Sequence, residues 1–220
     1  MSTVVLRCAE APVPITLSTL EVVPIAGRPT GAELDELLPI IDVDSLPRII
    51  VLGDDADMAA VLTHMLRSER LDIPLGFVPP ERTHGSRRLR TGTGSQAAKR
   101  AVRGEPLPTP LIRDETGAAL IGRAVIAAAD GTKIEGEAYV DDTLLFRGRA
   151  TELHVATNVT QPGLSARVRY GRARTRTWVA GRAVQLGATG AVVTRDGVPD
   201  DRVLKRCAFY RHHVPWLLLR

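Results

Sequence analysis

The chain has 220 residues, of which 44% are hydrophobic and 25% are charged, and its 29 basic and 25 acidic residues give a net charge of +4. This composition is typical of a folded globular protein and excludes a chain that is disordered throughout. Apolar runs such as Trp216–Leu219 are far shorter than the roughly 20 residues of a membrane-spanning helix. The only two cysteines, Cys8 and Cys207, exclude a disulfide framework, and Met1–Glu10 has no features of a secretory leader. We therefore expect a cytoplasmic protein.

The first half of the sequence alternates strand-like and helix-like segments. Arg48–Leu52 is a short apolar run between a proline and a glycine, which is typical of a buried strand in a parallel sheet. Asp57–Arg67 has apolar residues at helical spacing behind capping aspartates. Further strands are predicted over Leu20–Ile25 and Ile73–Val78, and further helices from Thr30 to Pro39 and over Ser95–Val102. This alternation predicts an α/β layered domain.

The second half contains short strand-like runs separated by turn signals such as Asp130-Gly131 and Asp196-Gly197. The runs are Ala119–Ala127, Ile134–Val140, Thr143–Arg147, Glu152–Ala156, Ala166–Tyr170, Arg176–Val179, Val184–Leu186, Ala191–Thr194 and Val203–Leu219. The sequence therefore predicts an α+β protein. A three-layer α/β domain with a parallel sheet is expected over residues 1–117, followed by an antiparallel β-sandwich-like domain over residues 118–220.

The loop Gly53-Asp54-Asp55-Ala56-Asp57 lies between a predicted strand and a predicted helix. In α/β proteins this location binds phosphates, because free backbone N–H groups and the helix dipole face the ligand. Three carboxylates would repel a bare phosphate, whereas Mg²⁺ bound to Asp55 would reverse that repulsion. The simpler interpretation is a helix cap with solvated acids, and the sequence favours it. Gly53 and Asp55 remain candidates for nucleotide or phosphate binding, with Asp55 as the metal ligand.

A basic stretch runs from Arg82 to Arg103 with no acidic residue inside it. Within it, Gly92 and Thr93 belong to the small-residue segment Thr91-Gly92-Thr93-Gly94-Ser95, which directly precedes a predicted helix. Backbone N–H groups in such a segment can bind an anion. The alternative is a solvated loop followed by the charged face of a helix.

Five arginines alternate along the second half, at Arg167, Arg169, Arg172, Arg174 and Arg176. Each set with a period of two projects from one face of a strand, where it can meet an anionic membrane surface or an acidic partner. Aromatic residues are sparse nearby, so nucleic-acid binding by base stacking is weakly supported. A solvated sheet face is the simpler interpretation.

The order of these segments resembles the diacylglycerol kinase catalytic family, which is related to the sphingosine and NAD kinases. The hallmark of that family is a Gly-Gly-Asp-Gly-Thr loop after a buried strand, and Gly53 and Asp55 match its first glycine and its aspartate. Gly92-Thr93 matches the family's Gly-Thr-x-Asn-Asp segment, with Ser-Gln in place of Asn-Asp. Val23–Arg28 is similar to the family's opening turn, and Asp196–Pro199 is similar to the tail of actinobacterial members.

The resemblance implies a nucleotide-binding α/β domain that is paired with a β-sandwich. It also implies Mg²⁺ and ATP as cofactors if the protein is active. Two glycines and the threonine of the hallmark loop are missing, and their loss predicts weak or absent ATP binding.

Three functions follow from the sequence. We expect a divergent, non-catalytic member that binds a phosphorylated or lipid ligand between its domains. The first alternative is an active ATP-dependent lipid kinase. The second is an interaction protein that uses the arginine face on an anionic partner, and an exposed strand edge in the second half would allow a homodimer.

Overall fold

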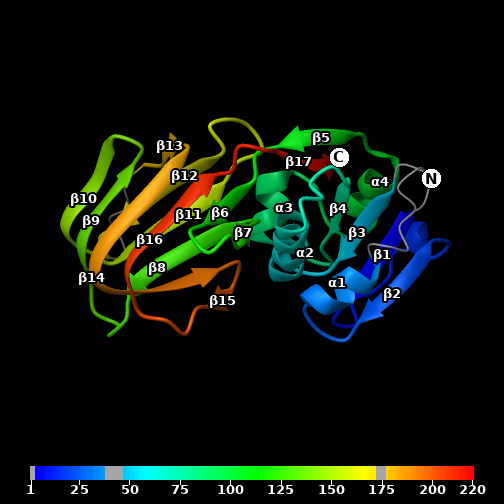
Figure 1. Cartoon of the computed structure of the whole chain (residues 1–220), viewed down its shortest axis with the longest axis horizontal. Coiled ribbons are helices and arrows are strands. Elements are labelled where there is room, and N and C mark those ends of the chain that lie inside the picture. The colour runs from blue at the N-terminus through cyan, green and yellow to red at the C-terminus, as the bar shows by residue number, and fades with distance from the viewer. Residues whose placement is uncertain (1–2, 38–46, 172–176) are drawn as a thin grey trace. The chain divides into compact units, whose positions relative to one another are not determined.

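The computed structural model describes residues 3–37, 47–171 and 177–220. The chain forms two compact units, which Figure 1 colours by position along the chain. The first unit comprises residues 1–109 and 214–220, and the second comprises residues 110–213. The expected division between residues 117 and 118 falls inside the second unit, in the turn between β6 (Ile112–Asp114) and β7 (Ala119–Leu120).

The first unit is built on a six-stranded sheet with the order β2-β1-β3-β4-β17-β5. Its strands are β1 (Thr3–Cys8), β2 (Glu21–Ile25), β3 (Arg48–Leu52), β4 (Leu75–Val78), β5 (Pro106–Thr109) and β17 (Trp216–Leu219). Every neighbouring pair is parallel except β17 and β5. The last strand of the chain therefore completes a sheet that the first residues begin.

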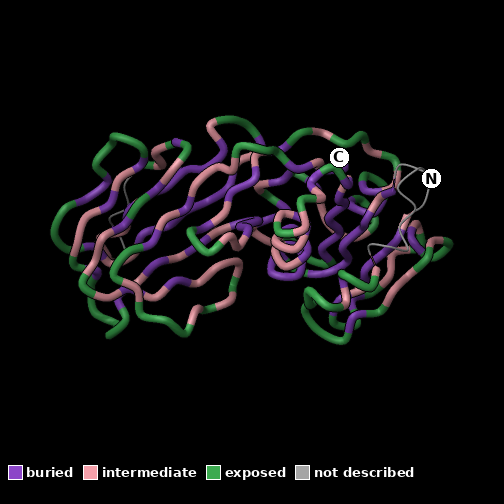
Figure 2. Tube along the Cα trace, in the orientation of Figure 1, coloured by how far each residue is buried: buried purple, intermediate pink, exposed green. Residues whose placement is uncertain are grey.

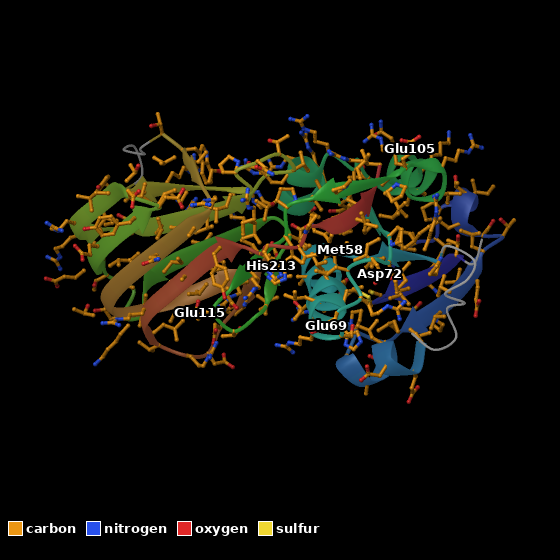
Figure 3. All side chains as sticks on the ribbon, turned by 45° about the horizontal axis from the view of Figure 1, so that its top comes forward. Met58, Glu69, Asp72, Glu105, Glu115 and His213 are labelled. Atoms are coloured by element: carbon orange, nitrogen blue, oxygen red, sulfur yellow. The ribbon has the colours of Figure 1, made fainter. Side chains whose placement is uncertain are left out.

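Helices cover both faces of this sheet, as the expected three-layer domain requires. They are α1 (Gly31–Leu37), α2 (Asp55–Arg67), α3 (His84–Leu89) and α4 (Gly94–Arg103). Alanines of α4 pack with Ile50 and Leu52 of β3 in one buried cluster. Since side chains alternate along a strand, Ile49 and Val51 point to the other face, where α2 contacts β3. Met58 of α2, labelled in Figure 3, is fully buried there.

The second unit is an eleven-stranded sheet around one core. Its remaining strands are β8 (Arg123–Ala128), β9 (Ile134–Val140), β10 (Thr143–Ala150), β11 (Glu152–Thr157), β12 (Leu164–Arg169), β13 (Val179–Gly181), β14 (Ala183–Arg195), β15 (Val198–Pro199) and β16 (Leu204–Arg211). Every strand pair in it is antiparallel. Side chains from β9 and β10 share one cluster with those from β11 and β12, so the sheet folds over itself. The alternation of buried and partly exposed residues along these strands is visible in Figure 2. The sandwich-like, antiparallel fold class is confirmed.

Several elements differ from the sequence prediction. Val184–Leu186 and Ala191–Thr194 are parts of one strand, β14, with a register shift between Gly187 and Ala191. Val203–Leu219 divides into β16 and β17, and these two strands belong to different units. Val23–Arg28 comprises the end of β2 and the turn after it, so it belongs to the second strand of the first unit and not to the opening one. No helix among the described residues is long and apolar enough to cross a membrane.

The Asp196-Gly197 turn has a structural role inside the second unit. The Asp196 carboxylate accepts hydrogen bonds from the backbone N–H groups of Ile121, Gly122 and Arg123, at 2.8, 2.7 and 2.9 Å. Bonds between a carboxylate and backbone N–H groups are among the stronger ones in proteins. The turn between β14 and β15 is thereby fixed to the start of β8.

Candidate functional site

Carboxylates close the N-terminus of α2 in the loop Gly53–Asp57. Asp54 precedes the helix, and its Oδ1 accepts hydrogen bonds from Ala56 N at 2.8 Å and from Asp57 N at 2.9 Å. In return, Asp57 Oδ2 accepts a hydrogen bond from Asp54 N at 2.9 Å, which completes a reciprocal capping box. The N–H groups that would face a phosphate at this helix start are therefore already bonded to the protein's own acids.

Gly53 is required by this cap. A β-carbon at Gly53 would overlap Asp57 Oδ2 and would lie 3.0 Å from the Cys8 β-carbon. Asp57 folds back over the glycine and is itself buried, and burial raises the pKa of its carboxyl to about 6. The glycine that matches the kinase loop thus makes room for a carboxylate.

Asp55 is the first residue of α2 and joins that helix to α3. Its side chain is buried, and its Oδ2 accepts a hydrogen bond from Gly85 N at 2.8 Å. Burial raises the pKa of the Asp55 carboxyl. Its Oδ1 is also buried and makes no hydrogen bond within the described residues. Asp55 therefore positions α3 beside α2, and the Thr83 side chain also influences its carboxyl.

Two of the three carboxylates in this loop are engaged in the helix cap, which limits how Mg²⁺ could be held there. A hard cation takes about six oxygen ligands, often from more than one carboxylate. Asp54 Oδ1 and Asp57 Oδ2 are engaged in the cap, which leaves Asp55 as the nearest candidate. Residues 3–37, 47–171 and 177–220 contain no group of three His, Cys, Asp or Glu side chains placed to hold a metal ion. Asp55 is therefore the one carboxylate of this loop outside the cap, and Mg²⁺ in nucleotide sites commonly uses one or two carboxylates together with waters and phosphate oxygens.

The segment around Gly92 and Thr93 has the opposite character. Thr93 precedes α4 and makes no side-chain hydrogen bond to the helix. Gly92 has φ +80° and Gly94 has φ +50°, backbone conformations that favour glycine. A β-carbon at Gly92 would lie 2.6 Å from Gln96 Oε1. No carboxylate caps α4, in contrast to α2, and the chain turns tightly into the helix.

Gly92 and Thr93 line a cavity of about 430 Å³ between α3 and α4. Its other lining residues are Arg82, Ser86, Arg87, Arg90, Gln96 and Arg100. Four guanidinium groups and no carboxylate thus surround it. Gly53 and Asp55 are not among the lining residues, so the four candidate phosphate-binding residues divide between two places.

The cavity arginines bind the backbone and a histidine. Arg100 Nη1 donates to Arg90 O at 2.8 Å, and Arg87 Nε donates to Thr83 O at 3.3 Å. Arg87 Nη2 lies 2.6 Å from His84 Nδ1. In the described part of the chain, none of the four cavity arginines is in a salt bridge. Glu105, labelled in Figure 3, follows the end of α4 and does not line the cavity. The positive charge of the cavity is therefore not neutralised by an acid in contact with it.

Sequence reasoning missed the helix that builds this cavity. α3 has six residues with no apolar periodicity, so hydrophobic spacing does not reveal it. The sequence signal for a helix start here is Thr83 followed three residues later by Ser86, a spacing that allows a capping box. Ser86 N donates to Thr83 Oγ1 and Thr83 N donates to Ser86 Oγ, both at 2.9 Å. This capping box at the start of α3 places Arg87 on the cavity wall.

Two of the five alternating arginines lie within the described residues. Arg167 and Arg169 project from the same face of β12, as expected from their spacing. Arg169 Nη1 donates to Glu152 Oε2 at 2.9 Å, and the Arg167 guanidinium lies 4.6 Å from the centre of the Trp178 ring. Arg172, Arg174 and Arg176 lie outside the described residues.

The comparisons with known proteins concern the fold. The sequence matches no protein-family profile and no curated protein. Among solved structures, a putative diacylglycerol kinase from Bacillus anthracis str. Sterne is similar, with a TM-score of 0.75 and 11% identity over 99% of this chain and 96% of that one. A second structure of a diacylglycerol kinase from the same strain has a TM-score of 0.70 and 12% identity, with the same coverage of both chains.

An NAD kinase from Archaeoglobus fulgidus in complex with ATP is also similar, with a TM-score of 0.62 and 16% identity over 99% of this chain and 92% of that one. Fold likeness at such identity carries no function with it, because one fold hosts many activities. The resemblance read from the sequence is confirmed at the level of the fold: the chain has the architecture of the diacylglycerol kinase and NAD kinase structures.

Proposed function

We propose that this chain is a non-catalytic relative of the lipid kinases that binds a phosphorylated ligand in the arginine-lined cavity between α3 and α4. The observation that carries the proposal is the capping of α2 by Asp54 and Asp57. Their carboxylates bond the backbone N–H groups that a nucleotide phosphate would otherwise use. At an effective dielectric constant of about 20, two like charges 4 Å apart repel by about 4 kcal/mol, which opposes a phosphate at this loop.

The cavity supports the other half of the proposal. Four guanidinium groups line it, and arginine binds phosphate through paired N–H groups in a fixed plane. Ser86 and Thr93 contribute hydroxyl groups at its wall, which suit the oxygens of a phosphomonoester. The diacylglycerol kinases of the same fold suggest a ligand with a phosphorylated glycerol headgroup.

The test is a calorimetric titration with glycerol 3-phosphate at fixed ionic strength. Arg82→Gln and Arg90→Gln each remove one cavity guanidinium, and each variant should bind about tenfold to a hundredfold more weakly, as expected for a hydrogen bond to a charged group. Arg103→Gln is the matched control, because Arg103 lies on α4 outside the cavity lining. Equal weakening in all three variants, or no binding by the wild type, would overturn the proposal.

An active ATP-dependent lipid kinase is the second candidate. It is favoured by Asp55, which matches the family's aspartate and has one buried oxygen that makes no hydrogen bond within the described residues. The assay is ATP turnover in the presence of diacylglycerol vesicles and Mg²⁺. Turnover by the wild type that is lost in Asp55→Asn would establish this candidate and refute the non-catalytic one.

A further inference from the structure

A polar cluster lies on the second unit's sheet, on the face of β11 and β12 that does not contribute to the hydrophobic core. Strand β11 contributes Glu152 and His154, and β12 contributes Arg167 and Arg169. In the antiparallel register, His154 lies directly opposite Arg167 and Glu152 lies directly opposite Arg169. The residues between them, Leu153 on β11 and Val168 on β12, belong to the hydrophobic core, so the four polar side chains share the other face.

Within this cluster, Arg169 pairs with a carboxylate and Arg167 contacts an aromatic ring. Glu152 Oε2 accepts a hydrogen bond from Arg169 Nη1 at 2.9 Å and lies 2.6 Å from His154 Nε2. The single carboxylate therefore serves both of these partners. Arg167 instead stacks over Trp178, at 4.6 Å from the ring centre. Arg123 of β8 also acts electrostatically on His154. With His154 neutral, the two arginines of β12 face one glutamate, so this part of the sheet has an excess of positive charge.

Two polar atoms of opposed residues have no hydrogen-bond partner among the described residues. Arg167 Nε and His154 Nδ1 are both buried, and neither makes a hydrogen bond within the part of the chain that the structure describes. His154 as a whole is only 4% exposed. An arginine Nε–H can only donate, and a buried donor without an acceptor costs about 1–3 kcal/mol. Native proteins rarely leave such atoms without a ligand, an ion or a water molecule to bond them.

We propose that His154 and Arg167 hold a phosphate-class oxyanion on this face of the second unit's sheet, with Arg123 adding to the attraction. The oxyanion accepts one hydrogen bond from Arg167 Nε and one from His154 Nδ1. Because His154 Nε2 already bonds Glu152, a donor at Nδ1 requires the imidazolium form. A neutral water molecule would not need this protonation, so the two occupants have different pH dependences.

The charges around His154 set that pH dependence. Burial lowers the pKa of His154, Glu152 raises it, and the positive charges of Arg123 and Arg167 lower it further. Glu152 is itself shared with Arg169. The histidine is therefore more easily deprotonated than a free one until an anion arrives. A bound anion favours the imidazolium, so its affinity should fall as the pH rises through the pKa of the complex, by up to tenfold per pH unit.

The experiment follows the imidazole signals of the full-length protein by NMR during titration with inorganic phosphate at constant ionic strength. It uses the Arg90→Gln background, so that binding in the first unit does not contribute. The His154→Gln variant identifies the His154 signal among those of the five histidines. The expected result is a saturable shift of that signal that is stronger at pH 6 than at pH 8. No saturable shift at either pH would overturn the proposal, as would a shift with the same apparent affinity at both.

Variants separate a site from general charge attraction. Arg167→Gln should weaken phosphate binding at least tenfold. Arg149→Gln removes an exposed arginine from β10 of the same unit and should leave binding unchanged. Equal weakening in both variants would mean an adventitious ion only and would overturn the proposal. The wild-type His154 shift keeps the test decisive if Arg167→Gln fails to fold.

Two further arms identify the source of the oxyanion. Phosphatidylcholine vesicles with and without phosphatidylglycerol are sedimented with the Arg90→Gln protein. Binding only to the anionic vesicles, competed by free phosphate and lost in Arg167→Gln, would support the site with a lipid headgroup as its ligand. A phosphate-dependent His154 shift without vesicle binding would support the site with free phosphate as its ligand.

Discussion

Replacing Gly53 by alanine tests whether this glycine serves the helix cap. The added β-carbon would overlap Asp57 Oδ2, and it would approach Asp57 Cγ and the Cys8 β-carbon to 3.0 Å each. Gly53 does not have a left-handed backbone, so the cost is steric. Overpacking of this kind typically costs about 1–3 kcal/mol of stability. If Asp57 swings away to relieve it, the loss of the cap costs about 1 kcal/mol.

The partner substitution makes the test specific. In an Asp57→Ala background the overlapping carboxylate is gone and only the Cys8 contact remains, so Gly53→Ala should cost less than it does in the wild type by about 1 kcal/mol. Independent sites add to within about 0.3–0.5 kcal/mol, so this difference is measurable. Gly27→Ala is the control, because a β-carbon there meets nothing within 4 Å.

Tryptophan fluorescence during urea unfolding provides the readout for the first unit. The protein has two tryptophans, and Trp216 is buried in β17 of the first unit at 2% exposure. A Trp178→Phe background leaves Trp216 as the single reporter of that unit. The same cost of Gly53→Ala with and without Asp57 would show that the Asp57 carboxylate is not the reason for a glycine at this position.

Three further predictions follow from buried groups. Burial raises the pKa of Asp57 to about 6, so the folded form holds this proton more tightly than the unfolded form. The stability that the protonated Asp57 contributes is present below about pH 4 and is lost as the pH rises through about 6. Asp57→Asn should reduce this loss of stability with rising pH, measured by urea unfolding monitored by Trp216 fluorescence. A pH profile that is unchanged in the variant would contradict the prediction. Asp196→Ala removes the acceptor of three backbone N–H groups and should destabilise the second unit by about 3 kcal/mol. Asp196→Asn should cause a smaller loss of stability. The measurement is urea unfolding followed by Trp178 fluorescence in a Trp216→Phe background. Burial raises the pKa of both Cys8 and Cys207 to about 12. Neither thiol should therefore react with a disulfide reagent at pH 8 until urea unfolds the protein. Rapid labelling of the folded chain would contradict this prediction.

Local patterns predicted the elements that carry a local signal. The bounds of β3 were predicted correctly, because Arg48–Leu52 is a continuous apolar run between Pro47 and Gly53. The predicted helix over Ser95–Val102 likewise lies within α4, with bounds that differ by one residue at each end. β1 (Thr3–Cys8) was missed, although it lies between β2 and β3 in the sheet. The pairing of β17 with β4 is a contact between distant parts of the chain, and no periodicity reports it.

The candidate sites were predicted in part for the same reason. The loop at Gly53–Asp57 lies where the sequence placed it, between a strand and a helix. The sequence alone does not show whether these acids bind a metal or cap the helix, because that depends on the side-chain conformations of Asp54 and Asp57. The arginine cavity depends on α3, whose position rests on the long-range bond from Gly85 N to Asp55. The His154–Arg167 pair depends on strand register, which the spacing within one strand does not determine.

The central claim is that phosphorylated ligands are held by the α3–α4 arginines and not by the loop at α2. The most direct test is a calorimetric titration with ATP, with and without Mg²⁺, of the wild type, Asp55→Asn and Arg90→Gln. We expect any ATP binding to be independent of Mg²⁺, unchanged in Asp55→Asn and at least tenfold weaker in Arg90→Gln. Binding that requires Mg²⁺ and is lost in Asp55→Asn, with Arg90→Gln unaffected, would contradict it.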